Sequence, residues 1–488
     1  YRQVSGGFNL DPVTSASIDR QEIETYALTG QSFLFNDAIV ATYGWRQDKA
    51  SSFRDGAPDQ NADNISLVDS LQLPSTPDNS IKADVFSWGV VGHVPNSWTE
   101  KIGMKLSAHY NESENFVPAP GRVSILNRPH DSPAGSTEEF GFSFGNLDDS
   151  FHVRVNWYET ISTNQTDNSL GAAQIPNWER LFYNNVRNSL QQLEERVPGD
   201  PSQGYWPHSI YWADTYTLPP LGMREAFWTP VNPDPSPGGT PQVSDHPNSN
   251  VTRVSDFTSK GMEIEGVWNP NRNLTLAFNV AKQEVKKNNV LQSYREYFDL
   301  REPQWLAMGH LIARPNTYKN ANPQTIYQRT RTVQWAGLIP QIVAEGQPSH
   351  EIREWRANFI TNYKFDDDSK LKGWSVGGAF RWQDEVAVGF LDGTVDGQTE
   401  YGVDGLGSFS VADFSQPVYG PAESNLDVWF AYGRKILNDK VGWKIQLNVR
   451  NVLDNDDLII TRVDFDGLPT RVRILNPINY RLTTTFDF

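Results

Sequence analysis

One stretch of the chain, YWPHSIYWADTYTLPPLGMREAFW at residues 205–228, is unusually rich in aromatic side chains. Flat rings stack on sugar rings or on other flat ligands, while polar neighbours fix the orientation of the ligand. The same rings could instead pack a long loop against its own helix, so both interpretations stay open. The candidate ligand-binding residues are Tyr205, Trp206, Tyr211, Trp212, Tyr216 and Trp228.

Motifs that carry catalytic chemistry are absent from the sequence. It contains no metal-protease, nucleophile-elbow or P-loop pattern. The glycines of GVDGLGSFS, residues 402–410, lack the strand-to-helix context of a nucleotide site. The eight His form no HxH or HxxxH pair, and the run Asp366–Asp368 is typical of a solvated turn. We therefore expect no catalytic residue, no metal site and no cofactor.

Alternation of apolar and polar residues recurs along the chain in pairs of segments. In WKIQLNVRN, for example, Trp443, Ile445, Leu447 and Val449 share one face of a strand. A period of two with one polar face indicates half-buried strands, and short polar turns join them into hairpins. With the last segment, PINYRLTTTFDF, the pattern predicts about 13 strands. The hairpins are expected around Asn36 and Asp37, and over 85–111, 138–159, 262–285, 355–383 and 426–450.

Long connections separate these hairpins. They cover roughly 51–80, 115–136, 163–255, 287–350 and 387–422. Short turns at one end of a sheet and long loops at the other are typical of outer-membrane barrels. A compact soluble domain seldom carries several structureless connections of that length. The pattern therefore favours an all-β, transmembrane, antiparallel up-and-down β-barrel with long extracellular loops.

Bulk composition is compatible with this fold. No run of 18 or more apolar residues occurs, and the mean hydropathy is -0.55. A transmembrane barrel keeps a low mean hydropathy because its strands alternate. The formal net charge of -17 argues against a nucleic-acid partner, since phosphate binding needs a basic surface. The absence of cysteine excludes disulfides and thiolate metal sites.

The two faces of the sheet are expected to carry different side chains, aromatic on one face and polar on the other. Tryptophans near strand ends predict aromatic girdles at the membrane interfaces. Alternating polar residues predict a partly basic lumen wall. In a porin this wall would bias the pore toward anions, whereas in a receptor with a plug inside its barrel it would face the plug. The girdle residues are Trp45, Trp88, Trp98, Trp157, Trp268, Trp355, Trp374, Trp382 and Trp443. The wall residues are Arg356, Asn358, Asn362, Lys364, Arg381, Lys444, Gln446, Asn448, Arg450 and Arg481.

Helical periodicity occurs inside two of the long loops. Residues 175–197 place Trp178, Phe182, Val186 and Leu190 at helical spacing. Residues 293–310 show a weaker pattern that Pro303 is expected to break. Packing within the loops is the simplest role for these helices, and docking of a partner is the alternative.

The carboxy-terminal segment resembles the end of TonB-dependent outer-membrane receptors. WKIQLNVRNVLDNDDLIITRVDFDG is followed by an alternating strand that ends in Phe488. Asn451, Val452, Leu453 and Asp454 stand where the family has an Asn-Leu-Phe-Asp-like motif, although the aromatic of that motif is missing here. The tract TGQSFLFNDAIVATYGWRQDKASSFRDG also resembles an internal hairpin of this family.

This resemblance implies a function and a set of partners. It implies active uptake of a scarce nutrient (an iron chelate, cobalamin or a glycan) across the bacterial outer membrane. Energy would come from the TonB–ExbB–ExbD system through a plug, and outer-membrane lipid would surround the barrel. Phe486 and Phe488 resemble the signal that the barrel-assembly machinery recognises.

The resemblance also implies a larger protein. Such barrels have about 22 strands, so residues 1–488 are expected to be the carboxy-terminal part of one, lacking the plug and about nine strands. An odd strand count cannot keep both termini in the periplasm, and residues 1–20 could add one strand to give about 14. Two alternatives stay open, namely a complete smaller diffusion porin and a soluble all-β carbohydrate-binding or carbohydrate-cleaving protein.

Overall fold

A computed structural model describes most of the chain. It covers residues 2–4, 7–9, 16–56, 58–61, 66–171, 175–177, 179–180, 183, 217–232, 242–245, 251–307, 335–349, 351–396, 408–438 and 440–488. Among these residues no helix is both long enough and apolar enough to cross a membrane.

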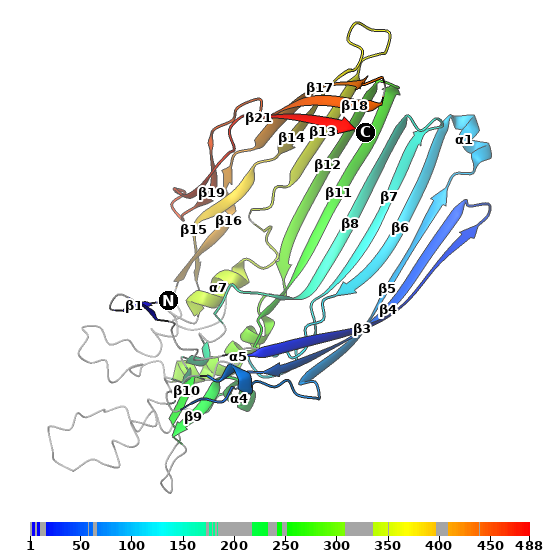
Figure 1. Cartoon of the computed structure of the whole chain (residues 1–488). Helices are drawn as coiled ribbons and strands as arrows, with labels where there is room; N and C mark the ends of the chain where they lie inside the picture. The colour runs from blue at the N-terminus through cyan, green and yellow to red at the C-terminus, as the bar shows by residue number, and fades with distance from the viewer. Residues whose placement is uncertain are drawn as a thin grey trace, which may run out of the picture.

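One large antiparallel sheet dominates the molecule, as Figure 1 shows. It contains 13 strands, which confirms the predicted count and the all-β, up-and-down fold class. Their spatial order is β21-β18-β17-β14-β13-β12-β11-β8-β7-β6-β5-β4-β3. The strands are β3 (Ile18–Leu34), β4 (Ile39–Asp55), β5 (Asn79–His93), β6 (Met104–Phe116), β7 (Ala134–Asn146), β8 (Phe151–Thr166), β11 (Val254–Asn271), β12 (Leu274–Asn288), β13 (Trp355–Lys364), β14 (Trp374–Gln383), β17 (Glu423–Ile436), β18 (Val441–Arg450) and β21 (Asn479–Asp487).

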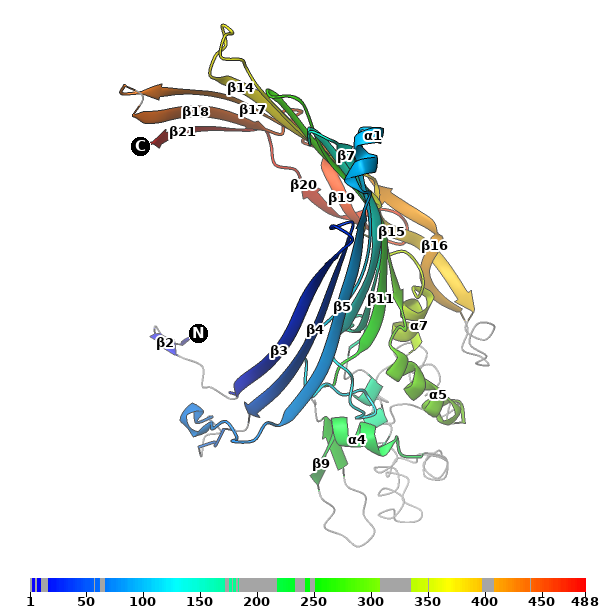
Figure 2. The same ribbon diagram turned by 90° about the vertical axis from the view of Figure 1, so that its right-hand side faces the viewer.

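The edges of this sheet are β3 and β21. Every pair in it is antiparallel, so with 13 strands the two edge strands run in the same direction. Direct antiparallel pairing between β3 and β21 is therefore impossible. Residues 1–20 do not add a fourteenth strand within the described part of the chain. There, β1 (Arg2–Val4) and β2 (Gly7–Asn9) pair with each other as a separate hairpin, and β3 itself starts at Ile18. Figure 2 shows how strongly the sheet curves.

Strand register separates the sheet into two chemically different faces. Phe359 pairs with Phe278 on one side and with Phe380 on the other, so the three rings share a face. Asn358 pairs with Asn279 and Arg381 on the opposite face. We call these the apolar face and the polar face. Side chains alternate between faces along a strand, so the register assigns each strand residue to one of them.

Short connections join the strands at the end that carries the carboxy-terminus. Phe35, Asn36 and Asp37 all have positive φ in the turn between β3 and β4. Asn and Asp tolerate this left-handed backbone better than other side chains, which explains why the tight turn forms at the predicted place. The connection between β5 and β6 holds the short helix α1 (Asn96–Ile102), which ends at Gly103 with φ 72°. We call this end the turn end.

The opposite end of the sheet, the loop end, carries the long connections and most of the helices (Figure 1). The helical elements are η1 (Val68–Ser70), α4 (Leu221–Phe227), α5 (Gln292–Ala307) and α7 (Ala336–Val343). The small hairpins are β9 (Trp228–Asn232) with β10 (Gln242–Asp245), β15 (Val386–Asp396) with β16 (Ser408–Gly420), and β19 (Leu458–Val463) with β20 (Pro469–Ile474). The alternation of apolar and polar residues did not predict the last two hairpins, because bulges shift the register between their paired strands.

The long loops share a hydrophobic core, and we call the unit that they form the loop domain. Its core residues come from segments that are far apart in sequence. Tyr294, Tyr297 and Phe298 of α5 are almost fully buried, and the ring of Phe298 meets the rings of Trp305 and Trp335 edge-on at 5.2 and 4.8 Å. The core is Ile125, Leu126, Leu170, Ile175, Tyr183, Met223, Phe227, Val251, Val290, Leu291, Tyr294, Tyr297, Phe298, Trp305, Trp335, Leu338, Ile339, Phe409 and Val411.

The predicted loop helices therefore pack within the loops. Helix α5 confirms the helix expected over 293–310, although it continues through Pro303 instead of breaking there. For the helix expected over 175–197, residues 175–177, 179–180 and 183 are helical, and the remainder lies outside the described residues. Ile175 and Tyr183 are buried in the core of the loop domain, as packing within the loops requires.

A buried ion pair ties two of these segments together. Arg301 of α5 donates to both carboxylate oxygens of Glu179, at 2.9 and 3.0 Å. The indole Nε1 of Trp305 donates to the same carboxylate at 2.8 Å. Glu179 is fully buried and Arg301 is 3% exposed. Breaking a buried, hydrogen-bonded pair is costly because the remaining charge is left without a partner.

Candidate functional site: the two faces of the sheet

The apolar face carries two aromatic rows with an apolar band between them. On β13 the face presents Trp355, Ala357, Phe359, Thr361 and Tyr363 in order, and β14 presents Trp382, Phe380, Gly378, Val376 and Trp374 beside them. The aromatic residues that end each series are eight positions apart, which is about 27 Å along a strand at ~3.4 Å per residue. A strand tilt of roughly 40° reduces this to about 20 Å, close to the height of the apolar band in outer-membrane barrels.

Among the described residues, no other segment covers this band. Phe359 is 47% exposed, and many large apolar side chains on the same face are similarly exposed. They include Leu28, Tyr43, Phe86, Trp88, Phe140, Phe142, Phe380, Phe430, Tyr480, Leu482 and Phe486. An apolar surface that spans a whole sheet far exceeds the patches found on soluble monomers.

Eight of the nine predicted girdle residues lie on the apolar face, although Trp45, Trp88 and Trp157 lie inside β4, β5 and β8 and not near their ends. The register places Trp45, Trp88, Trp157, Trp268, Trp355, Trp374, Trp382 and Trp443 on the apolar face. At the turn end the ring centroids of Trp374 and Tyr432 are 5.2 Å apart, and those of Tyr432 and Trp443 are 6.3 Å apart. Trp98 is different, because it lies in α1 and not in a strand.

The polar face carries the predicted wall. Pairing register places all ten wall residues on this face of β13, β14, β18 and β21, with Asn448 opposite Arg481 and Asn358 opposite Arg381. On β4 and β8, by contrast, the polar-face cations are already paired. Arg46 binds Asp48 at 2.9 Å, and Arg154 binds Glu139 at 2.9 Å.

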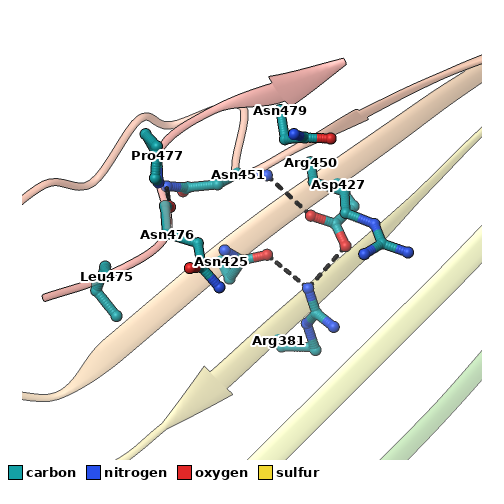
Figure 3. A pocket seen from close by; sticks show the side chains of 9 residues that line it. All are labelled: Arg381, Asn425, Asp427, Arg450, Asn451, Leu475, Asn476, Pro477 and Asn479. Atoms are coloured by element: carbon teal, nitrogen blue, oxygen red, sulfur yellow. Dashed lines mark hydrogen bonds and ion pairs between the residues drawn. The ribbon is translucent and has the colours of Figure 1, made fainter. Parts of the chain in front are cut away.

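A polar hollow of about 540 Å³ opens on the wall near its loop end, and we call it the loop-end hollow. Figure 3 shows its lining: Arg381, Asn425, Asp427, Arg450, Asn451, Leu475, Asn476, Pro477 and Asn479. The Arg381 guanidinium donates to Asn425 Oδ1 and to Asp427 Oδ2, both at 2.7 Å. Arg450 has no hydrogen-bond or ion-pair partner among the described residues, so its charge remains available.

Asn451 and Asp454, the first and last residues of the Asn-Val-Leu-Asp segment, shape this hollow. Both residues have positive φ, which turns the chain sharply after β18. Asn451 Nδ2 donates to the Asn476 carbonyl at 2.9 Å, and the Ile478 amide donates to Asp454 Oδ1 at 3.0 Å. The two side chains thereby hold the returning end of the last loop against the wall. Asn451 is 4% exposed, and its Oδ1 has no hydrogen-bond partner among the described residues.

A second hollow, of about 870 Å³, lies on the wall near the turn end. We call it the turn-end hollow. Its lining includes the side chains of Lys364, Lys435 and Lys444, together with Asp487. No group of three or more His, Asp or Glu side chains that could hold a metal ion occurs in the part of the chain that the structure describes.

Only one of the six predicted aromatic ligand-binding residues, Trp228, belongs to the described part of the chain. Tyr205, Trp206, Tyr211, Trp212 and Tyr216 lie outside the described residues. Trp228 is the first residue of β9, opposite Asp245 of β10. Its neighbour Phe227 is 4% exposed and packs in the core of the loop domain. For Phe227 the packing interpretation therefore holds, and ligand contact by the six candidates stays a prediction.

The predicted assembly residues lie on the last strand. Phe486 pairs with Trp443 on the apolar face, and Phe488 is fully exposed beyond the end of β21. Phe486 therefore belongs to the turn-end aromatic row, and recognition of the two residues by the assembly machinery stays a prediction.

An acidic side chain at the base of the loop domain predicts a pH dependence. Asp167 is 5% exposed; it accepts from Lys287 Nζ at 2.6 Å, from Ser255 Oγ and from Ser169. Burial alone would raise the pKa of Asp167, but these donors outweigh it and lower that pKa to about 2. Because the pKa is depressed on folding, the stabilisation is present above the unfolded value near 3.8 and is lost as pH falls through 2.

We therefore expect the loop domain to lose about 2 kcal/mol of stability between pH 5 and pH 2 through this residue. Hydrogen exchange of the loop domain at a series of pH values measures the effect. Asp167→Asn should flatten the profile in that range, and an unchanged profile in this variant would refute the assignment.

Comparison with known proteins gives matches of backbone shape only. No protein-family model matches the chain, and no curated protein is significantly similar to it in sequence. Three of the solved structures that it resembles are receptors or transporters of ferric chelates. The ferric preacinetobactin receptor BauA from Acinetobacter baumannii matches with a TM-score of 0.47 and 10% identity, over 97% of this chain and 44% of that chain.

The ferric citrate transporter FecA matches with a TM-score of 0.47 and 9% identity, over 97% of this chain and 46% of that one. The ferripyoverdine receptor of the outer membrane of Pseudomonas aeruginosa matches with a TM-score of 0.39 and 11% identity, over 98% and 50%. The chain thus spans half or less of the length of these three structures.

Proposed function

We propose that these 13 strands belong to the transmembrane barrel of a TonB-dependent outer-membrane receptor that takes up a scarce nutrient. The observation that carries the proposal is the apolar face, where two aromatic rows enclose an exposed apolar band of membrane dimensions. The polar wall on the opposite face is compatible with the water-filled interior of a barrel. The family is proposed because the segment around Asn451 and the terminal strand resemble those of TonB-dependent receptors.

The loop domain supports a receptor rather than an open pore. Its buried core and the Arg301–Glu179 pair hold the long loops in one arrangement at the loop end. Such an ordered surface is suited to ligand capture outside the cell, since ordering in advance lowers the entropic cost of binding. The TonB–ExbB–ExbD system, a plug and the barrel-assembly machinery enter as partners through the family resemblance.

Spin labels on neighbouring residues of one strand test the membrane orientation. Residues 1–488 contain no cysteine, so Phe142→Cys and Ser143→Cys each introduce one thiol into this part of the protein, on opposite faces of β7. In outer-membrane vesicles, the label at 142 should collide with dissolved oxygen, which concentrates in lipid. The label at 143 should collide with a water-soluble nickel chelate instead. Equal water accessibility at both sites would rule out the membrane-spanning sheet.

Uptake in whole cells tests the receptor function against a porin. A strain lacking the protein and a complemented strain are compared under iron limitation, under cobalamin limitation and on glycans as the carbon source. The proposal expects one growth defect that complementation repairs, together with uptake that stops when a protonophore dissipates the proton-motive force. Uptake that persists after protonophore treatment would favour passive diffusion.

A further inference from the structure

We propose that helix α1 is a membrane anchor that lies among the phospholipid headgroups of the periplasmic leaflet. The proposal rests on the proposed function, which places the turn end of the sheet on the periplasmic side of the outer membrane. Helix α1 (Asn96–Ile102) joins β5 to β6 at this end, as Figure 1 shows. In the described part of the chain the other connections at the turn end contain no helix, so α1 is a local addition to the barrel.

Exposed side chains divide α1 into an apolar and a polar side. Trp98 is 64% exposed and Ile102 is 52% exposed, and their spacing of four residues places them on the same side of the helix. Glu100 is also exposed, but it lies on the opposite side because successive residues turn by about 100°. Thr99, between the two sides, is buried. Apolar and charged residues on opposite sides are typical of helices that lie in a membrane interface.

The apolar side of α1 continues the apolar face of the sheet. Register places Met104 and Leu106 on the apolar face of β6, where Leu106 pairs with Phe144 of β7. Both residues are exposed. Ile102 and Trp98 precede them in the chain, so exposed apolar side chains extend from β6 into α1. Lipid is therefore the partner that fits this side of the helix, because the same face of the sheet is proposed to contact lipid.

The depth of α1 in the membrane follows from the length of β6. Near the loop end, Tyr110 is followed on the apolar face by Glu112, which pairs with Glu138 and marks the border of the apolar band. From Tyr110 to Met104, six positions span about 20 Å at ~3.4 Å per residue. A strand tilt of roughly 40° reduces this to about 16 Å, whereas the apolar band of outer-membrane barrels is about 25 Å tall. Because β6 ends before the band does, α1 lies at the turn-end border of the band.

Trp98 also fills a gap in the turn-end aromatic row. On the apolar face, β5 and β6 end at Gly92 and Met104, whereas β18 presents Trp443 at its turn end. Trp98 supplies the amphipathic ring that is favoured at headgroup depth. Lys101 is exposed and lies three residues after Trp98, so the two side chains are neighbours on the helix. A lysine at this depth extends its ammonium group to the phosphates of the lipid.

Spin labels on the two sides of α1 test this location. Trp98→Cys and Ile102→Cys each place a label on the apolar side, and each keeps the other apolar residue. Glu100→Cys is the matched control on the polar side. The full protein is reconstituted in nanodiscs of phosphatidylethanolamine and phosphatidylglycerol, which leave both membrane surfaces open to reagents. Collisions of each label with dissolved oxygen and with a water-soluble nickel chelate are measured, and the unmodified protein treated in the same way gives the background.

We expect the ratio of oxygen to nickel collision rates to be severalfold higher at positions 98 and 102 than at position 100. The reason is that oxygen concentrates in lipid while the chelate stays in water. With the label at 102, adding Trp98→Ser should raise the nickel collision rate, since the larger anchoring side chain is lost. Glu100→Ser in the same background should leave that rate unchanged. Only preparations with the heat-modifiable migration of a folded barrel are compared.

Two results would overturn the proposal. Equal ratios at the three positions, with frequent nickel collisions, would place α1 in the aqueous periplasm. Labels at 98 and 102 that neither reagent reaches would show that another protein segment covers the apolar side of α1. Failure of the proposed function itself would appear separately, as equal water accessibility of the labels at residues 142 and 143 of β7.

Discussion

Replacing Arg301 with methionine is expected to unfold the loop domain locally while the 13-stranded sheet stays intact. The substitution removes both hydrogen bonds from the guanidinium to the fully buried Glu179 carboxylate, together with the positive charge that balances it. Removing one member of a buried ion pair typically costs about 3–5 kcal/mol. That is enough to expose most of the apolar core that the loops share. Limited proteolysis followed by mass spectrometry measures the result, and cleavage should appear in α4 and α5, outside the strands of the sheet.

The matched control is Arg128→Met in the same loop domain. Arg128 binds Glu296 of α5 at 2.7 Å, but both side chains are exposed to solvent. An exposed pair contributes about 0–1 kcal/mol, so this variant should resist protease as the unmodified protein does. Equal protection of the Arg301 and Arg128 variants would mean that the buried pair does not hold the loops together.

A charge at the centre of the apolar face is expected to damage the protein far more than the same charge next to it. Phe359→Arg places a cation between the two aromatic rows of β13, where the proposal locates the bilayer core. Arginine at the midplane on the lipid face of a barrel costs about 2–4 kcal/mol. We expect a lower yield of assembled protein in the outer membrane and a lower midpoint in denaturant.

Asn358→Arg is the control, because it adds the same side chain one residue away. Asn358 lies on the polar face, where Arg356 and Arg381 are already accommodated. This variant should assemble nearly as well as the unmodified protein. If Asn358→Arg were as harmful as Phe359→Arg, or if both were harmless, the assignment of the two faces to lipid and lumen would fail.

Much of the sheet could be predicted from local pattern. The hairpin of Trp355 to Gln383 begins and ends at the predicted residues, because its alternation is strict and a short polar turn closes it. Strands such as β11 extend several residues beyond their predicted ends. Many of their additional residues, for example Asp256 and Lys286, are polar or charged, so the alternation of apolar and polar residues did not reveal these strand ends. Backbone pairing with neighbouring strands decides those boundaries.

The hairpins within the loops were missed for a similar reason. The sequence of β15, VAVGFLDGTVD, does not alternate cleanly, and two register shifts interrupt its pairing with β16. What holds it in place is contact with a distant segment, since Val386 and Val388 pack against Val463 of β19. Residues about 75 positions apart do not fall within one short sequence window, so the periodicity in such a window cannot predict their contact.

The sequence by itself determined the 13 strands of the large sheet and the chemistry of their two faces. It could do so because side chains alternate along a strand with period two, so composition at every second position specifies a face. Only the tertiary structure decided which charges remain unpaired and what the loops form. Arg381 meets Asp427 and Arg301 meets Glu179 across strands and loops, whereas Arg450 and Arg481 meet no carboxylate among the described residues. Such pairings depend on register and on loop packing, which bring together residues that local sequence keeps apart.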